Sequence, residues 1–187
     1  DHSERENYLF NSTINGIEES DLILLIGTNP RFEATMVNAR IRKAYLSNNT
    51  KIISLNDVGD LTYTYEILDG KTQTILDIAE NKNDLSKKII NSKKPMIILG
   101  ESFLNIKSAS YLFYTLKKFL VQNNKFTDEW NPFNILSTNA ATVGNFDLDI
   151  INHEKDLIKD LNENKFELIY LLGQDNLEFN KKNEFVI

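Results

Sequence analysis

Three glycines that end apolar runs are the residues of this chain whose placement could support chemistry. Gly27, Gly100 and Gly173 directly follow runs rich in Leu and Ile, and Gly27 leads into Thr28 and Asn29. In open α/β sheets, ligands bind beyond the carboxyl ends of the strands, and a glycine turn before a helix can hold a phosphate group. The candidate binding residues are therefore Gly27, Thr28, Asn29, Gly100 and Gly173.

The loops around these glycines lack a phosphate-binding motif. They comprise Gly27–Arg31, Asn56–Asp60, Gly100–Ser102 and Gly173–Asn176. Neither G-x-G-x-x-G nor G-x-x-x-x-G-K-[ST] occurs in them. The acids of the second and fourth loops would also repel a pyrophosphate. We therefore interpret these loops as vestigial. Their glycines serve chain geometry, and we predict no cofactor-binding residue and no catalytic residue.

Charged side chains in the loops have structural and functional interpretations. Arg31 could form an ion pair with Glu33 that fixes the first loop, which we favour, or it could meet an anion or a partner. Asp57 and Asp60 could serve metal binding or acid–base chemistry. Their place in a loop beside Thr62 favours turn capping instead.

The composition excludes several kinds of site. The chain has no cysteine, so it holds no disulfide and no cysteine-bound iron–sulfur cluster. Its two histidines, His2 and His153, make a zinc site or a Ser–His–acid triad improbable. We therefore predict no metal site.

Apolar runs and helical spacing predict the elements that would position these loops. Runs that are apolar throughout fit strands buried on both faces. The predicted strands are Leu22–Ile26, Lys51–Leu55, Met96–Leu99, Leu168–Leu172 and Phe185–Ile187. Apolar residues recurring at three- and four-residue steps predict helices. The predicted helices are Asn11–Ser20, Thr35–Leu46, a helix capped by Asp84, Ile106–Val121 and His153–Asn162.

Alternation of strands and helices predicts an α/β fold: a doubly wound, mostly parallel sheet with Rossmann-like strand–helix units. We interpret residues 1–187 as one domain, with a possible sub-boundary near residues 92–95. Thr127–Gly144 is the least periodic stretch and is expected to form a packed loop or small insertion.

The overall charge and the hydropathy limit the kinds of partner that this chain could bind. The formal net charge is −6, which argues against nucleic acid because phosphate contacts depend on cations. No apolar run is long enough to insert into a membrane. The chain begins at Asp1 without a Met and ends on the apolar Phe185–Ile187, so we expect a fragment of a longer protein. That last run is either a truncated strand or a docked terminal one.

Specific stretches of the sequence resemble a known family. Gly27–Lys43 and Asp60–Tyr65 closely resemble the large iron–sulfur subunit of NADH:ubiquinone oxidoreductase, respiratory complex I. The likeness continues through Lys93–Gly100, Trp130–Leu136 and Ile169–Asp175. It implies the molybdopterin-oxidoreductase-like C-terminal part of that subunit. In molybdopterin enzymes, an Asp-Pro-Arg turn follows the second strand and helps to hold a pterin dinucleotide. Here Leu55–Gly59 stands at that place without the Pro-Arg pair.

The resemblance implies a role in electron transfer from NADH to quinone, with this segment as a cofactor-free scaffold of the peripheral arm. It implies iron–sulfur clusters in a cysteine-rich N-terminal part and other peripheral-arm subunits as partners. It also implies the matrix side of the mitochondrial inner membrane, or the cytoplasmic side of a bacterial plasma membrane. Phe126, Trp130 and Phe133 could contact those partners or belong to the core. The alternative function is a molybdopterin-guanine-dinucleotide-binding portion of an enzyme similar to formate dehydrogenase.

Overall fold

A five-stranded parallel sheet forms the centre of the first part of the chain. A computed structural model describes residues 4–150, 157–163, 165–172, 178 and 185–186. The strands of the sheet are β1 (Leu22–Ile26), β2 (Lys51–Leu55), β3 (Glu66–Leu68), β4 (Pro95–Gly100) and β5 (Phe133–Leu136). They lie in the order β3-β2-β1-β4-β5, and every neighbouring pair is parallel. The predicted doubly wound α/β fold is confirmed.

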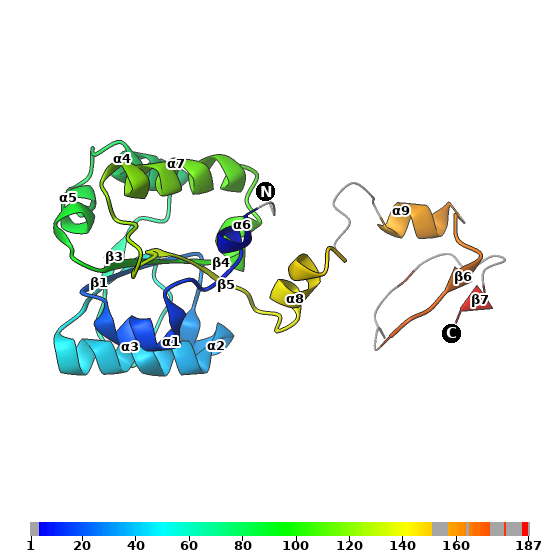
Figure 1. The fold of residues 1–187 in the computed structure, drawn as a ribbon, viewed down its shortest axis with the longest axis horizontal. Coiled ribbons are helices and arrows are strands. Elements are labelled where there is room, and N and C mark those ends of the chain that lie inside the picture. The colour runs from blue at the N-terminus through cyan, green and yellow to red at the C-terminus, as the bar shows by residue number, and fades with distance from the viewer. Residues whose placement is uncertain (1–3, 151–156, 164, 173–177, 179–184, 187) are drawn as a thin grey trace. The chain divides into compact units, whose positions relative to one another are not determined.

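Helices cover both faces of this sheet (Figure 1). One layer comprises α1 (Thr13–Gly16), α2 (Pro30–Glu33) and α3 (Thr35–Asn48). The other comprises α4 (Thr72–Ala79), α5 (Asp84–Asn91) and α7 (Ala109–Gln122). Shorter helices are η1 (Arg5–Asn7), η2 (Ile17–Glu19), α6 (Glu101–Leu104) and α8 (Thr142–Asp147).

Burial on both faces explains why β1 is apolar throughout. Successive side chains of a strand point to opposite faces. Accordingly, Leu22, Leu24 and Ile26 join one hydrophobic cluster, while Ile23 and Leu25 join the other. All five are buried, as expected for a central parallel strand.

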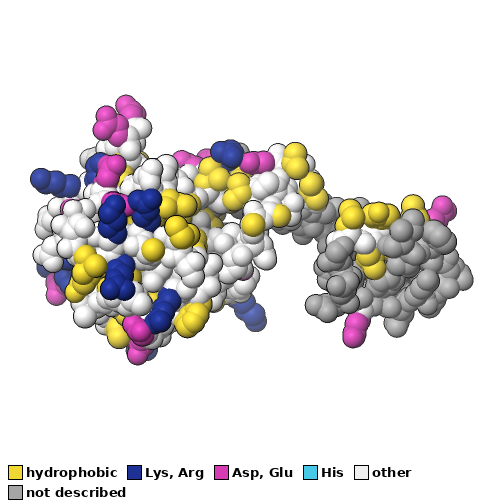
Figure 2. Space-filling model, turned by 90° about the horizontal axis from the view of Figure 1, so that it is seen from below, with side chains coloured by type: hydrophobic (Ala, Val, Ile, Leu, Met, Phe, Trp, Pro, Cys, Tyr) yellow, Lys and Arg dark blue, Asp and Glu magenta, His cyan; other side chains and the backbone are white. Residues whose placement is uncertain are grey.

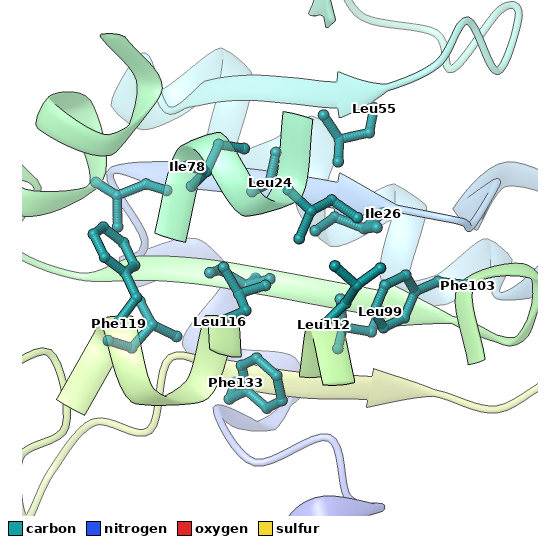
Figure 3. Close-up of a cluster of buried hydrophobic side chains, with 14 of the residues drawn as sticks. Leu24, Ile26, Leu55, Ile78, Leu99, Phe103, Leu112, Leu116, Phe119 and Phe133 are labelled. Carbon is teal, nitrogen blue, oxygen red and sulfur yellow. The ribbon is translucent and has the colours of Figure 1, made fainter. Parts of the chain in front are cut away.

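The larger cluster lies between the sheet and α4, α5 and α7. In Figure 3, Leu112 of α7 lies next to Leu99 of β4, and Leu116 of α7 lies next to Phe133 of β5. The rings of Phe113 and Phe133 meet edge to face, with centroids 4.8 Å apart. The smaller cluster lies between the sheet and α3, and it includes Trp130.

The structure corrects several predicted boundaries. The helix predicted over Asn11–Ser20 is divided into α1 and η2. The cap of α5 is Asn83 rather than Asp84, since the Asn83 side chain accepts the Leu85 N–H at 2.9 Å. The stretch Thr127–Gly144, predicted to be a loop, contains β5 and the start of α8. Strand β3 was not predicted.

The described residues form two compact units that divide between Gly144 and Asn145. Residues 92–95 lie inside the first unit and lead into β4, which pairs directly with β1. The second unit contains α9 (Leu157–Asn162) and a parallel pair of short strands, β6 (Leu168–Ile169) and β7 (Phe185–Val186). The predicted helix from His153 and the predicted strand to Ile187 extend beyond the described residues.

A buried asparagine ties the N-terminal segment to the outer edge of β5. Asn134 accepts the Ser12 backbone N–H at 2.7 Å and donates to the Ser12 hydroxyl at 3.0 Å. The Ile135 N–H also donates to the Leu9 carbonyl at 2.9 Å. These bonds satisfy polar groups along an edge that would otherwise be open to another strand.

Replacing Asn134 should therefore destabilise the first unit. Asn134→Ala leaves the buried Ser12 N–H without its acceptor, so we expect a loss of about 1–3 kcal/mol in the free energy of unfolding. Asn91→Ala, the same change at an exposed position of α5, should alter stability by less than about 0.5 kcal/mol. Urea unfolding of both variants measures the difference. Equal effects would contradict this role of Asn134.

Candidate functional site

The candidate site is the carboxyl rim of the five-stranded sheet, at the point where the strand order reverses. The chain leaves β1 toward β2 and β3, then returns to β4 on the other side of β1. Doubly wound sheets bind their ligands in the crevice beyond such a reversal. The residues that follow β1 and end β4 are Gly27 and Gly100, two of the predicted site residues.

The chain itself fills this crevice. Gly27 has a φ of +62°, and a Cβ built there would lie 2.7 Å from the Phe103 Cβ. A Cβ on Gly100 would lie 2.5 Å from the Thr28 Cβ. Phe103 itself is only 3% exposed. The two glycines therefore allow a close packing of the β1 and β4 loops, with α6 seated against them.

Internal hydrogen bonds occupy the polar groups of the first loop. The Glu33 carboxylate accepts from the Thr28 hydroxyl at 2.6 Å and from the Asn29 N–H at 3.0 Å. Asn29 caps α2 by accepting the Arg31 N–H at 3.1 Å. Two backbone donors of this turn, the N–H groups of Asn29 and Arg31, are thus already bonded within the loop.

Arg31 joins the first loop to the second one. Its guanidinium pairs with Asp60 at 2.5 Å and also donates to the Asp60 carbonyl. The favoured Arg31–Glu33 ion pair was therefore wrong, because Glu33 turns back toward Thr28 and Asn29. Arg31 is half-buried and Asp60 is exposed, so the main effect of their ion pair is to hold the two loops in register.

Two carboxylates cap the loop after β2, as predicted. Asp57 accepts the Gly59 N–H at 2.8 Å, and Asp60 accepts the Thr62 N–H at 2.7 Å. The Gly59 N–H and then the Tyr65 hydroxyl hold the pKa of Asp57 below its ordinary value. The Thr62 N–H and then Arg31 lower the pKa of Asp60.

A third carboxylate closes the rim at β4 and β5. Glu101 accepts from the Thr138 hydroxyl at 2.6 Å and from the Thr138 N–H at 2.9 Å. These two donors lower the pKa of Glu101 against the opposing effect of desolvation. Asp57, Asp60 and Glu101 are therefore ionised at neutral pH, which makes this rim unfavourable for a phosphate.

A small cavity remains beside the packed loops. Its volume is about 150 Å³, below the roughly 300–1,000 Å³ of typical ligand pockets. Asn56, Thr72, Ser102 and Phe103 are among its lining residues. Phe103 was not predicted, because its role depends on spatial contact with Gly27. Only its position three residues after a strand-end glycine could have indicated it.

Other predicted residues lie away from this rim or outside the described part of the chain. Gly173, the rest of its loop to Asn176, and His153 fall among the residues that are not described. Trp130 and Phe133 are buried, and Phe126 packs against the larger cluster, so core packing explains all three. Within the described residues, no group of His, Asp or Glu is arranged to hold a metal.

Substitution of the rim glycines should separate crowding from backbone strain. Gly27→Ala introduces both, so we expect it to cost about 2–5 kcal/mol of unfolding free energy. Gly100→Ala crowds the Gly27 carbonyl oxygen and Thr28 and should cost about 1–3 kcal/mol. Gly59→Ala (φ +78°, no neighbour within 4 Å) should show strain alone, about 1 kcal/mol. Thermal and urea unfolding measure all three. A Gly27→Ala variant no less stable than Gly59→Ala would contradict the closed crevice.

The lowered pKa of Glu101 predicts a pH dependence of stability. The carboxylate stabilises the fold above its unfolded pKa of about 4.3, and this contribution is lost as the pH falls through the lower folded value. Glu101→Gln should therefore show a shallower loss of unfolding free energy than the wild type between about pH 5 and pH 3. Thr138→Val removes one donor and should give an intermediate slope. Urea unfolding across this range tests the order, and identical slopes would contradict it.

The amino-acid sequence is similar to those of several known proteins. The 75 kDa subunit of NADH-ubiquinone oxidoreductase from Reclinomonas americana is 40% identical over 98% of this chain. The 78 kDa mitochondrial subunit from Neurospora crassa is 38% identical over 98% of it. The mitochondrial NADH dehydrogenase [ubiquinone] iron-sulfur protein 1 of Solanum tuberosum is 36% identical over 95% of it.

These relatives confirm the resemblance that Gly27–Lys43 and Asp60–Tyr65 suggested. The chain spans about a quarter of their length: 27%, 24% and 23% in the order given. The family model described as molybdopterin oxidoreductase matches residues 1–187. Since that match covers the whole sequence, the chain belongs to the molybdopterin oxidoreductase family.

Proposed function

We propose that this chain is part of the large iron–sulfur subunit of NADH:ubiquinone oxidoreductase and serves there as a cofactor-free scaffold of the peripheral arm. The complete enzyme passes electrons from NADH to quinone and translocates protons. The names of three relatives, each similar over nearly the whole chain, support the assignment to this subunit. The segment itself contributes shape rather than catalysis.

The closed crevice between β1 and β4 is the observation that carries the scaffold role. Membership of the molybdopterin oxidoreductase family implies a bound pterin dinucleotide. The residues at this rim do not fit such a cofactor. Phe103 packs against Gly27 where the ligand would enter, and the remaining cavity is about 150 Å³. The N–H groups of Asn29, Gly59 and Thr138 already bond to carboxylates of the chain.

The iron–sulfur clusters of the subunit would lie outside this segment. Protein clusters are held mainly by cysteine thiolates, and the sequence has no cysteine. We place the clusters, of 2Fe–2S and 4Fe–4S type, in a cysteine-rich N-terminal part of the same subunit. The two units of the segment would belong to one molybdopterin-oxidoreductase-like domain, in keeping with a family match over residues 1–187.

The partners would be other subunits of the peripheral arm. The relatives whose names include "mitochondrial" support a place on the matrix side of the inner membrane, and a bacterial enzyme would place it on the cytoplasmic side. In the described part of the chain, none of the helices is long and apolar enough to cross a bilayer. The net charge of −6 also disfavours nucleic acid as a partner.

The scaffold role predicts that rim changes leave electron transfer intact. Thr72 and Ser102 line the residual cavity and would contact a bound cofactor. In the assembled complex, Thr72→Ala and Ser102→Ala should therefore leave NADH-to-quinone turnover per assembled complex unchanged. As a comparison, Leu116→Ala in the core should lower the amount of assembled complex, because deleting buried methyl groups costs about 2–5 kcal/mol. Native gels and turnover assays measure both quantities.

A loss of turnover per complex in either rim variant would contradict the scaffold role. The alternative, a molybdopterin-guanine-dinucleotide-binding segment, has its own test. Calorimetric titration of the purified protein with guanine nucleotides and with the pterin dinucleotide should give no saturable heat. Tight, saturable binding would favour the alternative instead.

A further inference from the structure

The outer face of α3 carries an apolar stripe that the fold does not use. Val37, Ile41 and Ala44 form the inner face of this helix and are buried. On the opposite face, Met36, Ala39, Lys43 and Leu46 are exposed; the exposed fraction is 66% for Met36 and 68% for Leu46. Their spacing of three, four and three residues is that of a seam between two packed helices.

The short helix α2, which contacts α3, adds a further exposed apolar side chain, Phe32. Phe32 is 80% exposed, and Ala34, whose backbone is not helical, separates its helix from α3. We name the set Phe32, Met36, Ala39, Lys43 and Leu46 the α3 seam. Single exposed apolar residues need no explanation, but aligned ones mark contact surfaces. Figure 2 views this helical layer from below and shows hydrophobic side chains beside Lys and Arg.

Cations outnumber acids beside the α3 seam. Arg40, Arg42 and Lys43 belong to α3, and the helix contains no acid. Glu18 pairs with both Arg40 and Lys43, so two cations share one carboxylate. Arg42 is exposed, and its charge acts on Asp60, which already forms an ion pair with a cation of α2. A chain with a net charge of −6 therefore presents a locally basic helix here.

We propose that the α3 seam binds an amphipathic helix of a partner protein whose apolar stripe is flanked by Asp or Glu. Such a helix would place its apolar residues against Met36 and Leu46, because seams of this spacing interdigitate with a second helix. Its flanking carboxylates would meet Arg42 and the cations that Glu18 only partly neutralises. This inference stands apart from the proposed function, since it depends only on α2 and α3.

Other occupants fit the seam less well. A second copy related by a two-fold axis would bring one basic α3 against another, and like charges across an interface are unfavourable. A lipid surface would be met by only a few apolar side chains interrupted by Lys43, which is too little for stable anchoring. A nucleic acid would engage the cations through its phosphates but would leave Met36 and Leu46 exposed.

Site-specific photo-crosslinking in the full protein, expressed in its own cells, tests the proposal. A benzophenone amino acid replaces Met36, and as a control the same amino acid replaces Gln73, an exposed residue of α4 in the opposite layer. Mass spectrometry then maps the crosslinked peptide. We expect one segment of another chain with apolar residues at helical spacing and flanking acids. Arg42→Glu combined with Lys43→Glu should lower the yield by about tenfold or more.

The affinity of that mapped segment gives a second measurement. As a synthetic peptide it should bind the wild-type protein and lose about tenfold or more in affinity to Met36→Asp, with unchanged thermal unfolding as the check on folding. No crosslink above the Gln73 control would overturn the proposal. Crosslinks to a second copy, to residues of the same chain, to lipid or to nucleic acid would also overturn it, as would a yield that survives the charge reversal.

Discussion

The close approach of β1 and β4 at their carboxyl ends constrains everything at the candidate site. Their register pairs Ile26 with Leu99, so Gly27 and Gly100 are the next residues to meet. Any side chain at either position would collide with the neighbouring loop. Because glycine permits that contact, Phe103 can pack over the strand ends and bury itself. The crevice in which doubly wound sheets hold their ligands is thereby used for internal packing.

Electrostatics act in the same direction as this packing. A turn that binds phosphate offers backbone N–H groups with no internal acceptor. Along this rim, Glu33 and Asp57 accept N–H groups of their own loops, and Glu101 accepts the N–H of Thr138 from the loop after β5. The carboxylates thus occupy the donors and add negative charge where an anion would sit. Steric closure and charge are independent obstacles to a dinucleotide, so relieving one of them would leave the other.

Local patterns predicted the central strands well and the edges poorly. β1, β2 and β4 are apolar because both their faces are covered, and that pattern is visible in the sequence. β3 is a short, exposed edge strand without such a pattern. β5 follows Pro132 and has a polar residue, Asn134, at its centre, whose burial depends on Ser12, 122 residues earlier. Strands of that kind are defined by distant contacts, which a single sequence does not display.

The same distinction separates the predicted and missed features of the site. Turn capping by Asp57 and Asp60 is a two-residue interaction, so residue type and spacing were sufficient to predict it. The partner of Arg31 lies 29 residues away and competes with the nearby Glu33, which favoured the wrong pair. Phe103 presents the same difficulty, because its contact with Gly27 joins loops from different strands.

A sheet whose rim is closed can contribute only through its outer surfaces, and both helical layers leave apolar side chains exposed there. In the layer of α4, α5 and α7, α7 turns one face into the core and leaves Tyr111, Tyr114 and Val121 exposed. In the other layer, α3 has apolar residues on both faces, and only the inner set is needed for folding. Ile41 and Ala44 already anchor α3 to the core. Burying the exposed apolar side chains of this helix against a partner would therefore cost little backbone entropy. The α3 seam is therefore a preorganised surface of the scaffold, in contrast to the rim, whose polar groups are already bonded within the chain.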